Sequence, residues 1–279
     1  MSAAAFPIAL TIAGSDSGGG AGIQADLRTF SFHLVHGTSA LTCVTAQNTQ
    51  GVVRVEALAP AAVVAQIEAV TTDMTVRAVK TGMLLNQPII AAVANCLQAW
   101  EIPLVVDPVM VSRTGAQLID DDAIAALRSQ LLPLATVLTP NRYEAQILSG
   151  LTIETLADMQ TAAKKIQALG PQAVVVKGGG FTGELRGIDV WYDGTQLQVL
   201  ETQTVDTQDT HGTGCTLSAA IAANLARGAA PLAATLAAKQ YVTEALQHAL
   251  RIGQGQGPVG HFYPLLRRAG ASPASGLEG

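Results

Sequence analysis

The sequence predicts a three-layer α/β/α sandwich with a mostly parallel central sheet. Short apolar runs alternate along the chain with longer segments in which apolar residues recur at helical spacing. Most of the short runs are apolar along their whole length, which is typical of parallel strands that are covered on both faces. Strands separated by helices of this length pack as a parallel sheet between two helical layers.

The expected elements follow one another in a regular order. Residues 8–13 read IALTIA, a buried strand, and a glycine-rich turn then leads into an amphipathic helix over residues 23–34. The turn at Asp193 and Gly194 predicts a hairpin over 188–192 and 197–202, which adds an antiparallel edge. The other expected strands are 39–46, 52–58, 78–81, 104–106, 136–138 and 173–176. The other expected helices begin at Pro60 or cover 88–100, 120–131, 155–169, 213–227 and 231–248.

The composition is apolar and weakly charged. Of 279 residues, 49% are hydrophobic and 13% are charged, and the net charge is −5. This combination excludes intrinsic disorder and gives no global electrostatic reason to bind nucleic acid. The chain has no stretch of roughly 20 consecutive apolar residues and no signal-peptide pattern. Because its three cysteines form no paired framework either, we expect a cytoplasmic protein without membrane or nucleic-acid partners.

The chain is expected to form one domain over residues 1–266. It shows no internal repeat, and no linker divides it before about residue 265. Residues 267–279 are small, polar and rich in proline, glycine and serine, so we expect a disordered tail there.

In an open parallel sheet a ligand binds beside the carboxyl ends of the strands, so the residues after each strand are candidates for a site. The glycine-rich segment 14–22 is the first of these. It is a permissive turn, a dinucleotide-binding loop, or a loop whose amides approach a small substrate beside Asp16 or Asp26. The dinucleotide alternative lacks an acidic residue about twenty positions downstream.

Two further candidates carry carboxylates. Asp107 directly follows the apolar run 104–106, where an acidic residue is either functional or caps a helix. In the segment 139–144, Pro140 and Asn141 are typical of a helix start, which is the purely structural interpretation. Glu144, near that start, is also suited to a divalent cation such as magnesium, which prefers oxygen ligands.

The segment 209–216 is the most specific candidate. The amides of residues 212–215 open an apolar helix, an arrangement that binds phosphate through its N–H groups and the helix dipole. Cys215 lies in the same field, which lowers the pKa of a thiol and makes a thiolate available. The structural alternative is a buried cysteine that serves as a small hydrophobe, as we interpret Cys43 and Cys96. His211 is either a turn residue or the partner of Cys215 in a nucleophile pair.

Together these segments describe a phosphoryl-transfer site, which needs positioning, charge neutralisation and a base for the attacking hydroxyl. Lys177 ends the apolar run 173–176 and precedes three glycines, so it is a natural phosphate partner. A surface lysine is the alternative, but the position after a buried strand argues against it. The chain contains no GxxxxGK[ST] loop and no protein-kinase signature.

A series of motifs in register resembles a known family. They are ALTIAGSDSGGGAGIQADL, TAQNTQGV, KTGML, VDPVM, LTPNRYEA, VVVKGGG, THGTGCTLSAAIA and GPVGHF. From about residue 8 to 262, the chain is similar to the bacterial hydroxymethylpyrimidine/phosphomethylpyrimidine kinases of the ribokinase-like superfamily. The resemblance implies ATP-dependent phosphorylation of 4-amino-5-hydroxymethyl-2-methylpyrimidine (HMP) to its monophosphate and then to its diphosphate, in thiamine diphosphate biosynthesis. It also implies ATP and Mg²⁺ as cofactors, a small lid or none, and a homodimer.

The resemblance also implies roles for single residues. The pyrimidine pocket is expected to be lined by Gly14, Asp26, Gln47, Met83 and Val109. Magnesium is expected at Asp107 and Glu144, and the nucleotide at Lys177, Lys239 and Asn141. The catalytic group is expected to comprise Gly212, Thr213, Gly214, Cys215 and Lys177, with Cys215 as base where sugar kinases carry an aspartate. Gly180 stands where relatives commonly have histidine, so its nucleotide contacts are expected to differ.

Three alternatives remain open at this point. A pyridoxal kinase shares the fold and the anion-binding helix start. A non-catalytic pyrimidine sensor would have no use for Asp107, Glu144, Lys177 and Cys215. A cysteine hydrolase using Cys215 and His211 would leave the phosphate-site residues without a purpose.

Overall fold

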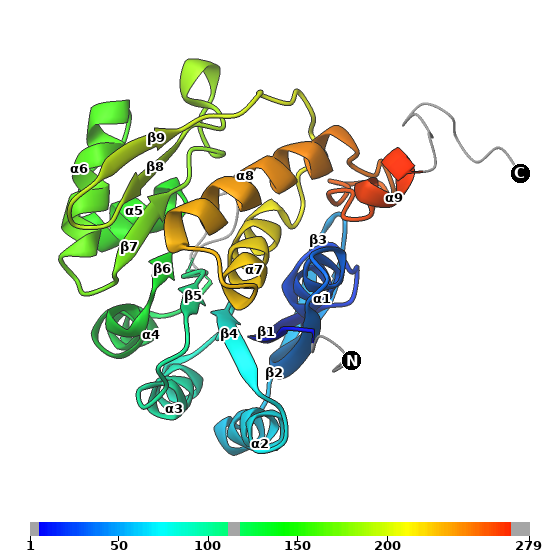
Figure 1. The fold of residues 1–279 in the computed structure, drawn as a ribbon, viewed down its shortest axis with the longest axis vertical. Helices are drawn as coiled ribbons and strands as arrows, with labels where there is room; N and C mark the ends of the chain where they lie inside the picture. The colour runs from blue at the N-terminus through cyan, green and yellow to red at the C-terminus, as the bar shows by residue number, and fades with distance from the viewer. Residues whose placement is uncertain (1–5, 111–117, 269–279) are drawn as a thin grey trace, which may run out of the picture.

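The described residues form one nine-stranded sheet between two layers of helices (Figure 1). The computed structural model describes residues 6–110 and 118–268. The strand order is β3-β2-β1-β4-β5-β6-β7-β8-β9. Neighbours from β2 to β7 pair in parallel, whereas β3, β8 and β9 add antiparallel edges. The strands are β1 (Ile8–Asp16), β2 (His36–Asn48), β3 (Gly51–Ala57), β4 (Val76–Thr81), β5 (Leu104–Val106), β6 (Val137–Leu138), β7 (Ala173–Val176), β8 (Asp189–Tyr192) and β9 (Leu197–Leu200).

The helices divide between the two faces of the sheet, each with its own apolar core. Helices α2 to α6 cover one face and α1, α7 and α8 cover the other. The alanine-rich α7 is buried along almost all of its length, because small side chains let its backbone approach the sheet closely. The helices are α1 (Gly22–Phe32), α2 (Pro60–Thr71), α3 (Gln87–Leu97), α4 (Asp121–Ala126), α5 (Arg142–Ser149), α6 (Leu156–Gln167), α7 (Thr213–Ala226), α8 (Pro231–Gln247) and α9 (Tyr263–Arg268).

Most of the expected elements are confirmed, and the differences have physical causes. The expected helix over 120–131 ends as an α-helix at Ala126 and continues as a wider turn over Leu127–Leu131. Pro133, which lacks an amide N–H, then ends the helical run in a short 3₁₀ turn. Helix α9 was not expected, and it extends to Arg268, inside the segment interpreted as a tail. Residues 269–279 of that segment lie outside the described residues.

Strand β3 is the least buried part of the sheet. All seven of its residues are exposed, although four of the seven are valine or alanine. It is the terminal strand and pairs with only the second half of β2, from Cys43 to Asn48. The apolar run 52–58 predicted this strand but not its exposure, because exposure depends on what packs against it. Within the described ranges, no helix has the length and apolarity needed to cross a bilayer.

The closing segment after α8 packs a histidine against α7. His261 is 2% exposed, and its Nε2 lies 2.9 Å from the Thr216 hydroxyl. Burial, with a smaller effect of the Arg28 charge, lowers the pKa of His261 to about 4. Between pH 6.5 and 4 the unfolded chain therefore binds a proton that the folded chain excludes, so stability falls as the pH falls through this range.

We expect acid to destabilise the protein partly through His261. Relative to pH 7.5, this residue should lower the free energy of unfolding by about 2 kcal/mol at pH 5. Urea unfolding followed by circular dichroism at both pH values measures the loss, and His261→Gln should show a smaller one. Equal pH dependence in the two proteins would contradict the assignment.

Candidate active site

The carboxyl ends of β5 and β7 bring an ion pair together. Asp107 directly follows β5 and Lys177 directly follows β7, and Lys177 Nζ lies 2.9 Å from Asp107 Oδ1. The carboxylate also accepts hydrogen bonds from the Thr139 and Ser218 hydroxyls, both at 3.3 Å. Burial disfavours the ammonium, but Asp107 and Glu144 outweigh it and hold the pKa of Lys177 above its usual value. The sequence-based expectation that these two residues share a site agrees with this geometry.

Glu144 both caps a helix and approaches this ion pair. Asn141 Oδ1 accepts the Glu144 amide at 3.0 Å, and Glu144 Oε2 accepts the Asn141 amide at 2.8 Å, which is a complete capping box. The structural interpretation of Asn141 is therefore confirmed. Glu144 is 2% exposed, and its pKa is raised to about 8, by burial first and by Asp107, against the opposing charge of Lys177.

The first turn of α7 lies directly on the ion pair. A Cβ at Gly214 would stand 3.4 Å from Lys177 Nζ and 3.7 Å from Asp107 Oδ2. Gly212, at φ +81°, caps the helix, and a Cβ there would stand 1.8 Å from the Gly20 carbonyl oxygen, so only glycine fits. Amides of this turn and a lysine ammonium thus meet at one place, an arrangement that binds phosphate, although the Thr213 amide already donates to the Thr210 carbonyl at 3.3 Å.

Cys215 lies in this turn, but the expectation of a lowered pKa is wrong for this structure. Burial raises the pKa of Cys215 to about 11, and the charges of Asp26 and Asp107 add to the rise. Lys80 and the Gly22 amide oppose it without overcoming it. Lost hydration therefore outweighs the favourable contacts, and Cys215 is a neutral thiol at physiological pH.

Asp26, expected in the pyrimidine pocket, lies in a fully buried ion pair. Its Oδ2 is 2.8 Å from Lys80 Nζ and 2.6 Å from the Thr11 hydroxyl, and both charged side chains are 0% exposed. Among the residues that the structure describes, its Oδ1 has no hydrogen-bond partner. Sequence reasoning missed Lys80, although a lysine inside an otherwise buried strand is a signal that could have found it.

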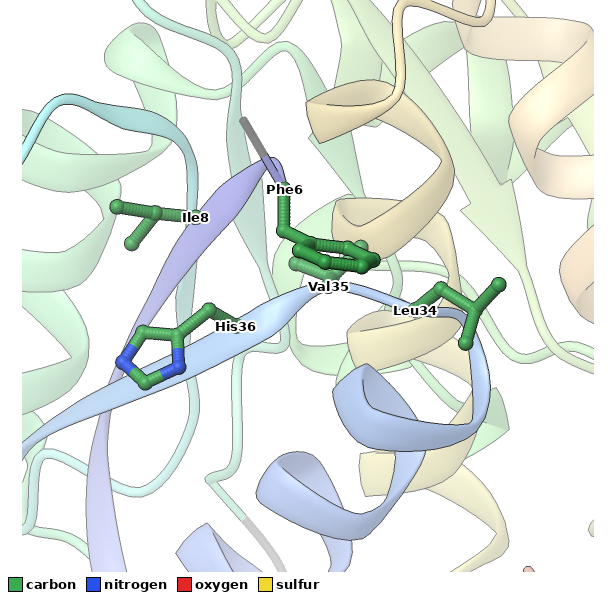
Figure 2. A pocket seen from close by; sticks show the side chains of 5 residues that line it. All are labelled: Phe6, Ile8, Leu34, Val35 and His36. Carbon is green, nitrogen blue, oxygen red and sulfur yellow. The ribbon is translucent and has the colours of Figure 1, made fainter. Parts of the chain in front are cut away.

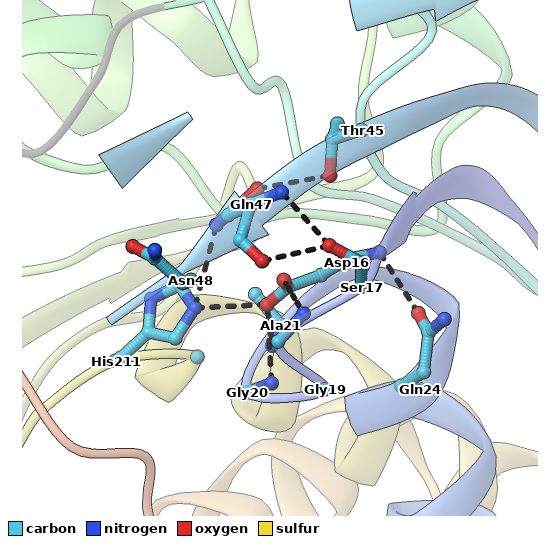
Figure 3. A network of polar contacts seen from close by, with 12 residues as sticks. Asp16, Ser17, Gly19, Gly20, Ala21, Gln24, Thr45, Gln47, Asn48 and His211 are labelled. Carbon is cyan, nitrogen blue, oxygen red and sulfur yellow. Dashed lines mark hydrogen bonds and ion pairs between the residues drawn. The ribbon is translucent and has the colours of Figure 1, made fainter. Parts of the chain in front are cut away.

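The other expected pocket residues lie at three places: Gly14 with Met83, Gln47 at the end of β2, and Val109 after β5. A Cβ at Gly14 would stand 3.0 Å from Met83 Cε, so these two residues are neighbours. Gln47 lies at the end of β2, beside Asp16 and His211 (Figure 3). The Val109 amide hydrogen-bonds the Asp107 carbonyl at 2.9 Å, so Val109 begins the turn after β5. The pocket that these residues are expected to line, and the role of each of them, stay predictions.

Lys239 forms a buried ion pair that contacts the loop after β7. Its ammonium lies 2.7 Å from Asp189 Oδ2 and 2.6 Å from the Gly187 carbonyl, and the residue is buried. Asp189 Oδ1 in turn accepts the Gly178 amide at 2.9 Å, next to Lys177. Lys239 therefore holds the loop that follows β7, and its expected contact with the nucleotide stays a prediction.

A separate pocket lies at the amino ends of the strands, away from the ion pair. It is lined by Phe6, Ile8, Leu34, Val35 and His36, at the amino ends of β1 and β2 (Figure 2). Four of these side chains are apolar and only His36 can titrate. The Asp107–Lys177 ion pair lies instead at the carboxyl ends of the strands, where an open parallel sheet binds its ligand.

The residues of this site lie within the segment of the chain that matches one protein-family model. The family model described as phosphomethylpyrimidine kinase covers residues 16–260. The chain belongs to this phosphomethylpyrimidine kinase family. A hydroxymethylpyrimidine/phosphomethylpyrimidine kinase from Synechococcus elongatus is 65% identical over 261 residues, which are 94% of this chain and 99% of that relative.

Solved structures related to this family share the fold. A Bacillus subtilis pyridoxal kinase in complex with ADP has a TM-score of 0.86 at 43% identity, covering 94% of this chain and 100% of that one. A phosphomethylpyrimidine kinase from Clostridium difficile has a TM-score of 0.77 at 42% identity, covering 86% and 99%. The expected ribokinase-like fold and the expected kinase class are confirmed.

A substitution at Gly214 tests whether the first turn of α7 binds the phosphoryl group, because Gly214 lies beside the ion pair. Gly214→Ala should fold normally, because the added methyl meets its neighbours at ordinary distances, but it occupies the place where a phosphoryl group would bind. We expect ATP-dependent turnover to fall by about 100-fold. Turnover close to that of the unchanged protein, with an unchanged melting temperature, would show that the first turn of α7 does not contact the reacting group.

Proposed function

We propose that the protein transfers the γ-phosphoryl group of ATP to the hydroxymethyl group of HMP, and then phosphorylates the monophosphate to the diphosphate in thiamine diphosphate biosynthesis. The observation that carries the proposal is the first turn of α7 lying on the Asp107–Lys177 pair in a member of the phosphomethylpyrimidine kinase family. ADP bound to a structural neighbour supports ATP as the donor. All three cysteines are free, which agrees with a reducing cytoplasm.

Different residues have different roles in the proposed phosphoryl transfer. Lys177 and the amides of residues 212–215 hold the transferring group and stabilise its charge. The substrate hydroxyl oxygen bonds to phosphorus, the bond to the ADP oxygen breaks, and the hydroxyl proton passes to Cys215. Because the resting thiol is neutral, this base role needs Cys215 to release its own proton to solvent before the transfer, and Lys80 and the Gly22 amide favour the resulting thiolate.

The carboxylates fit a magnesium ion bound together with the nucleotide. Glu144 and Asp107 face one lysine, and the pKa of Glu144 is raised to about 8, so a further cation would stabilise its ionised form. No cluster of three or more His, Cys, Asp or Glu side chains among the described residues could hold a metal alone. Phosphate oxygens and water would supply the remaining ligands, and the ion would neutralise phosphate charge.

A pyridoxal kinase is the second candidate. The Bacillus subtilis structure with a TM-score of 0.86 is titled a pyridoxal kinase, which supports pyridoxal as an alternative substrate for this fold. The two activities differ in the ring that is bound, which neither the fold nor the anion site determines. Only the substrate assay separates them.

We expect ATP consumption with HMP to exceed that with pyridoxal, and mass detection to show mono- and diphosphate products. Cys215→Ala should lower turnover by at least about 100-fold, with little change in the apparent affinity for HMP. Cys96→Ala, on α3, is the matched control and should remain active. Near-normal turnover of Cys215→Ala would rule out the base role, and preference for pyridoxal would rule out the substrate.

We also propose that the protein is a homodimer formed through β3. This strand leaves one edge of the sheet unpaired and exposes Val52, Val53 and Val55 by 52%, 83% and 39%. Antiparallel pairing of two copies about Val55 would place each Arg54 opposite Glu56 of the partner subunit, so the edge is complementary to itself in charge. Such pairing would cover exposed apolar surface and an open strand edge.

Val53→Lys should weaken this dimer, because it adds a charged side chain to the apolar face of the strand that pairing would cover. Sedimentation velocity is expected to show a dimer for the unchanged protein and a monomer for the variant. Leu236→Lys, which replaces an exposed apolar residue on α8, should leave the dimer intact. A monomer in the unchanged protein, or a dimer in Val53→Lys, would refute the proposed interface.

A further inference from the structure

The ion pair between Lys239 and Asp189 lies at the base of the loop 178–188, which joins β7 to β8. Lys239 Nζ lies 2.7 Å from Asp189 Oδ2 and 2.6 Å from the Gly187 carbonyl oxygen. Lys239 and Asp189 are 6% and 7% exposed, so protein groups rather than water surround the ammonium. Because two of its three hydrogens are donated to these partners, the ammonium has at most one left for a ligand.

The other oxygen of Asp189 fixes the direction in which the chain leaves β7. Asp189 Oδ1 accepts the Gly178 amide at 2.9 Å. A Cβ at Gly178 would stand 1.8 Å from the Ile188 carbonyl oxygen, so the two ends of the loop touch at this glycine. The Gly187 amide also donates to the Gly178 carbonyl at 3.3 Å. The Asp189–Lys239 pair therefore holds both ends of the loop, one through Gly178 and the other through Gly187.

Lys177 directly precedes this anchored glycine. Its amide donates to the Pro140 carbonyl at 2.9 Å, while the next amide, that of Gly178, is held by Asp189. The backbone is thus fixed on both sides of the Lys177 Cα, and the Lys177 ammonium lies 2.9 Å from Asp107 Oδ1. Loss of the hydrogen bond between Gly178 and Asp189 would release the chain next to Lys177. A displacement of about 1 Å in a positioned group lowers a rate by about 100-fold.

The ammonium that lies on the first turn of α7 is that of Lys177 and not that of Lys239. A Cβ at Gly214 would stand 3.4 Å from Lys177 Nζ and 3.7 Å from Asp107 Oδ2. Among the described residues outside α7, only these two have atoms within 4 Å of that position. Lys239, on α8, reaches the base of the loop instead.

We infer that Lys239 is a positioning residue for Lys177: paired with Asp189, it fixes the Gly178 turn from which the Lys177 side chain reaches the phosphoryl site. The inference rests on the proposed function, since ATP-dependent phosphorylation of HMP is one of its readouts. Lys239 acts through Asp189 and Gly178 and not by touching the nucleotide. The expected contact of Lys239 with the nucleotide is the alternative that the test separates.

The test uses Lys239→Met alone and in combination with Asp189→Asn. Lys239→Met leaves the Asp189 carboxylate buried and unpaired, which should draw it away from the Gly178 amide. We expect hydrogen exchange of the amides in the loop 178–188, followed by mass spectrometry, to become about tenfold faster, and turnover to fall by at least about tenfold. In the double variant the side-chain oxygen at position 189 still accepts the Gly178 amide and no charge is left unpaired. Exchange, turnover and the affinity for ADP should then lie within about threefold of the values of the unchanged protein.

A direct contact between Lys239 and phosphate predicts a different pattern. The double variant would still lack the ammonium, so its affinity for ADP, measured by calorimetry, would be at least about tenfold lower than that of the unchanged protein. That result would overturn the inference, as would unchanged exchange of the loop in Lys239→Met or a double variant with turnover as low as that of Lys239→Met. The double variant alone decides between the two roles if Lys239→Met does not fold.

Lys164→Met is the matched control, because Lys164 is an exposed lysine on α6. This variant should leave the exchange of the loop, the turnover and the affinity for ADP unchanged. Failure of the proposed function would appear separately, as absence of ATP-dependent phosphorylation of HMP in the unchanged protein. The exchange of the loop amides would still report whether Lys239 fixes the Gly178 turn.

Discussion

The ion pair between Asp107 and Lys177 is the interaction on which the rest of the site depends. Both side chains are largely withdrawn from water, where an isolated charge is too costly to keep. Each is held because two parallel strands end at the same edge and two hydroxyls complete the carboxylate's hydrogen bonds. The first turn of α7 lies against this pair, because a Cβ at Gly214 would stand 3.4 Å from Lys177 Nζ.

Buried charge is organised in the same way elsewhere in the molecule. Lys80 pairs with Asp26 between β4 and α1, and Lys239 pairs with Asp189 between α8 and β8. With Lys177 and Asp107, these are lysine–carboxylate pairs that each join two different elements beside the buried helix α7. Although only 13% of the residues are charged, several of these lie in the interior as ion pairs. Removing one partner would leave the other buried and unpaired, which costs more than the pair itself contributes.

Close contacts join the glycine-rich loop to the start of α7. The glycine-rich loop approaches α7 so closely that side chains at Gly20 or Gly212 would collide with it. Asp16 organises the loop amides and holds His211, which stands before the anion-binding turn. Asp16 was only one of two alternatives in the sequence, because nothing in the order of residues shows which carboxylate gathers the loop amides. The folded loop decides it, since its amides converge on Asp16 while Asp26 points into the core.

The sequence by itself determined the fold class, most strands and helices, and the candidates at the strand ends, because these follow from local apolar patterning and from where each run stops. It also indicated Asp107, Lys177, Glu144 and the turn at residues 212–215. Only the tertiary structure decided that Lys80 is buried against Asp26, that Lys239 pairs with Asp189, that the thiol of Cys215 is neutral and that β3 is exposed. These are properties of groups far apart in sequence, and burial and charge depend on which of them the fold brings together.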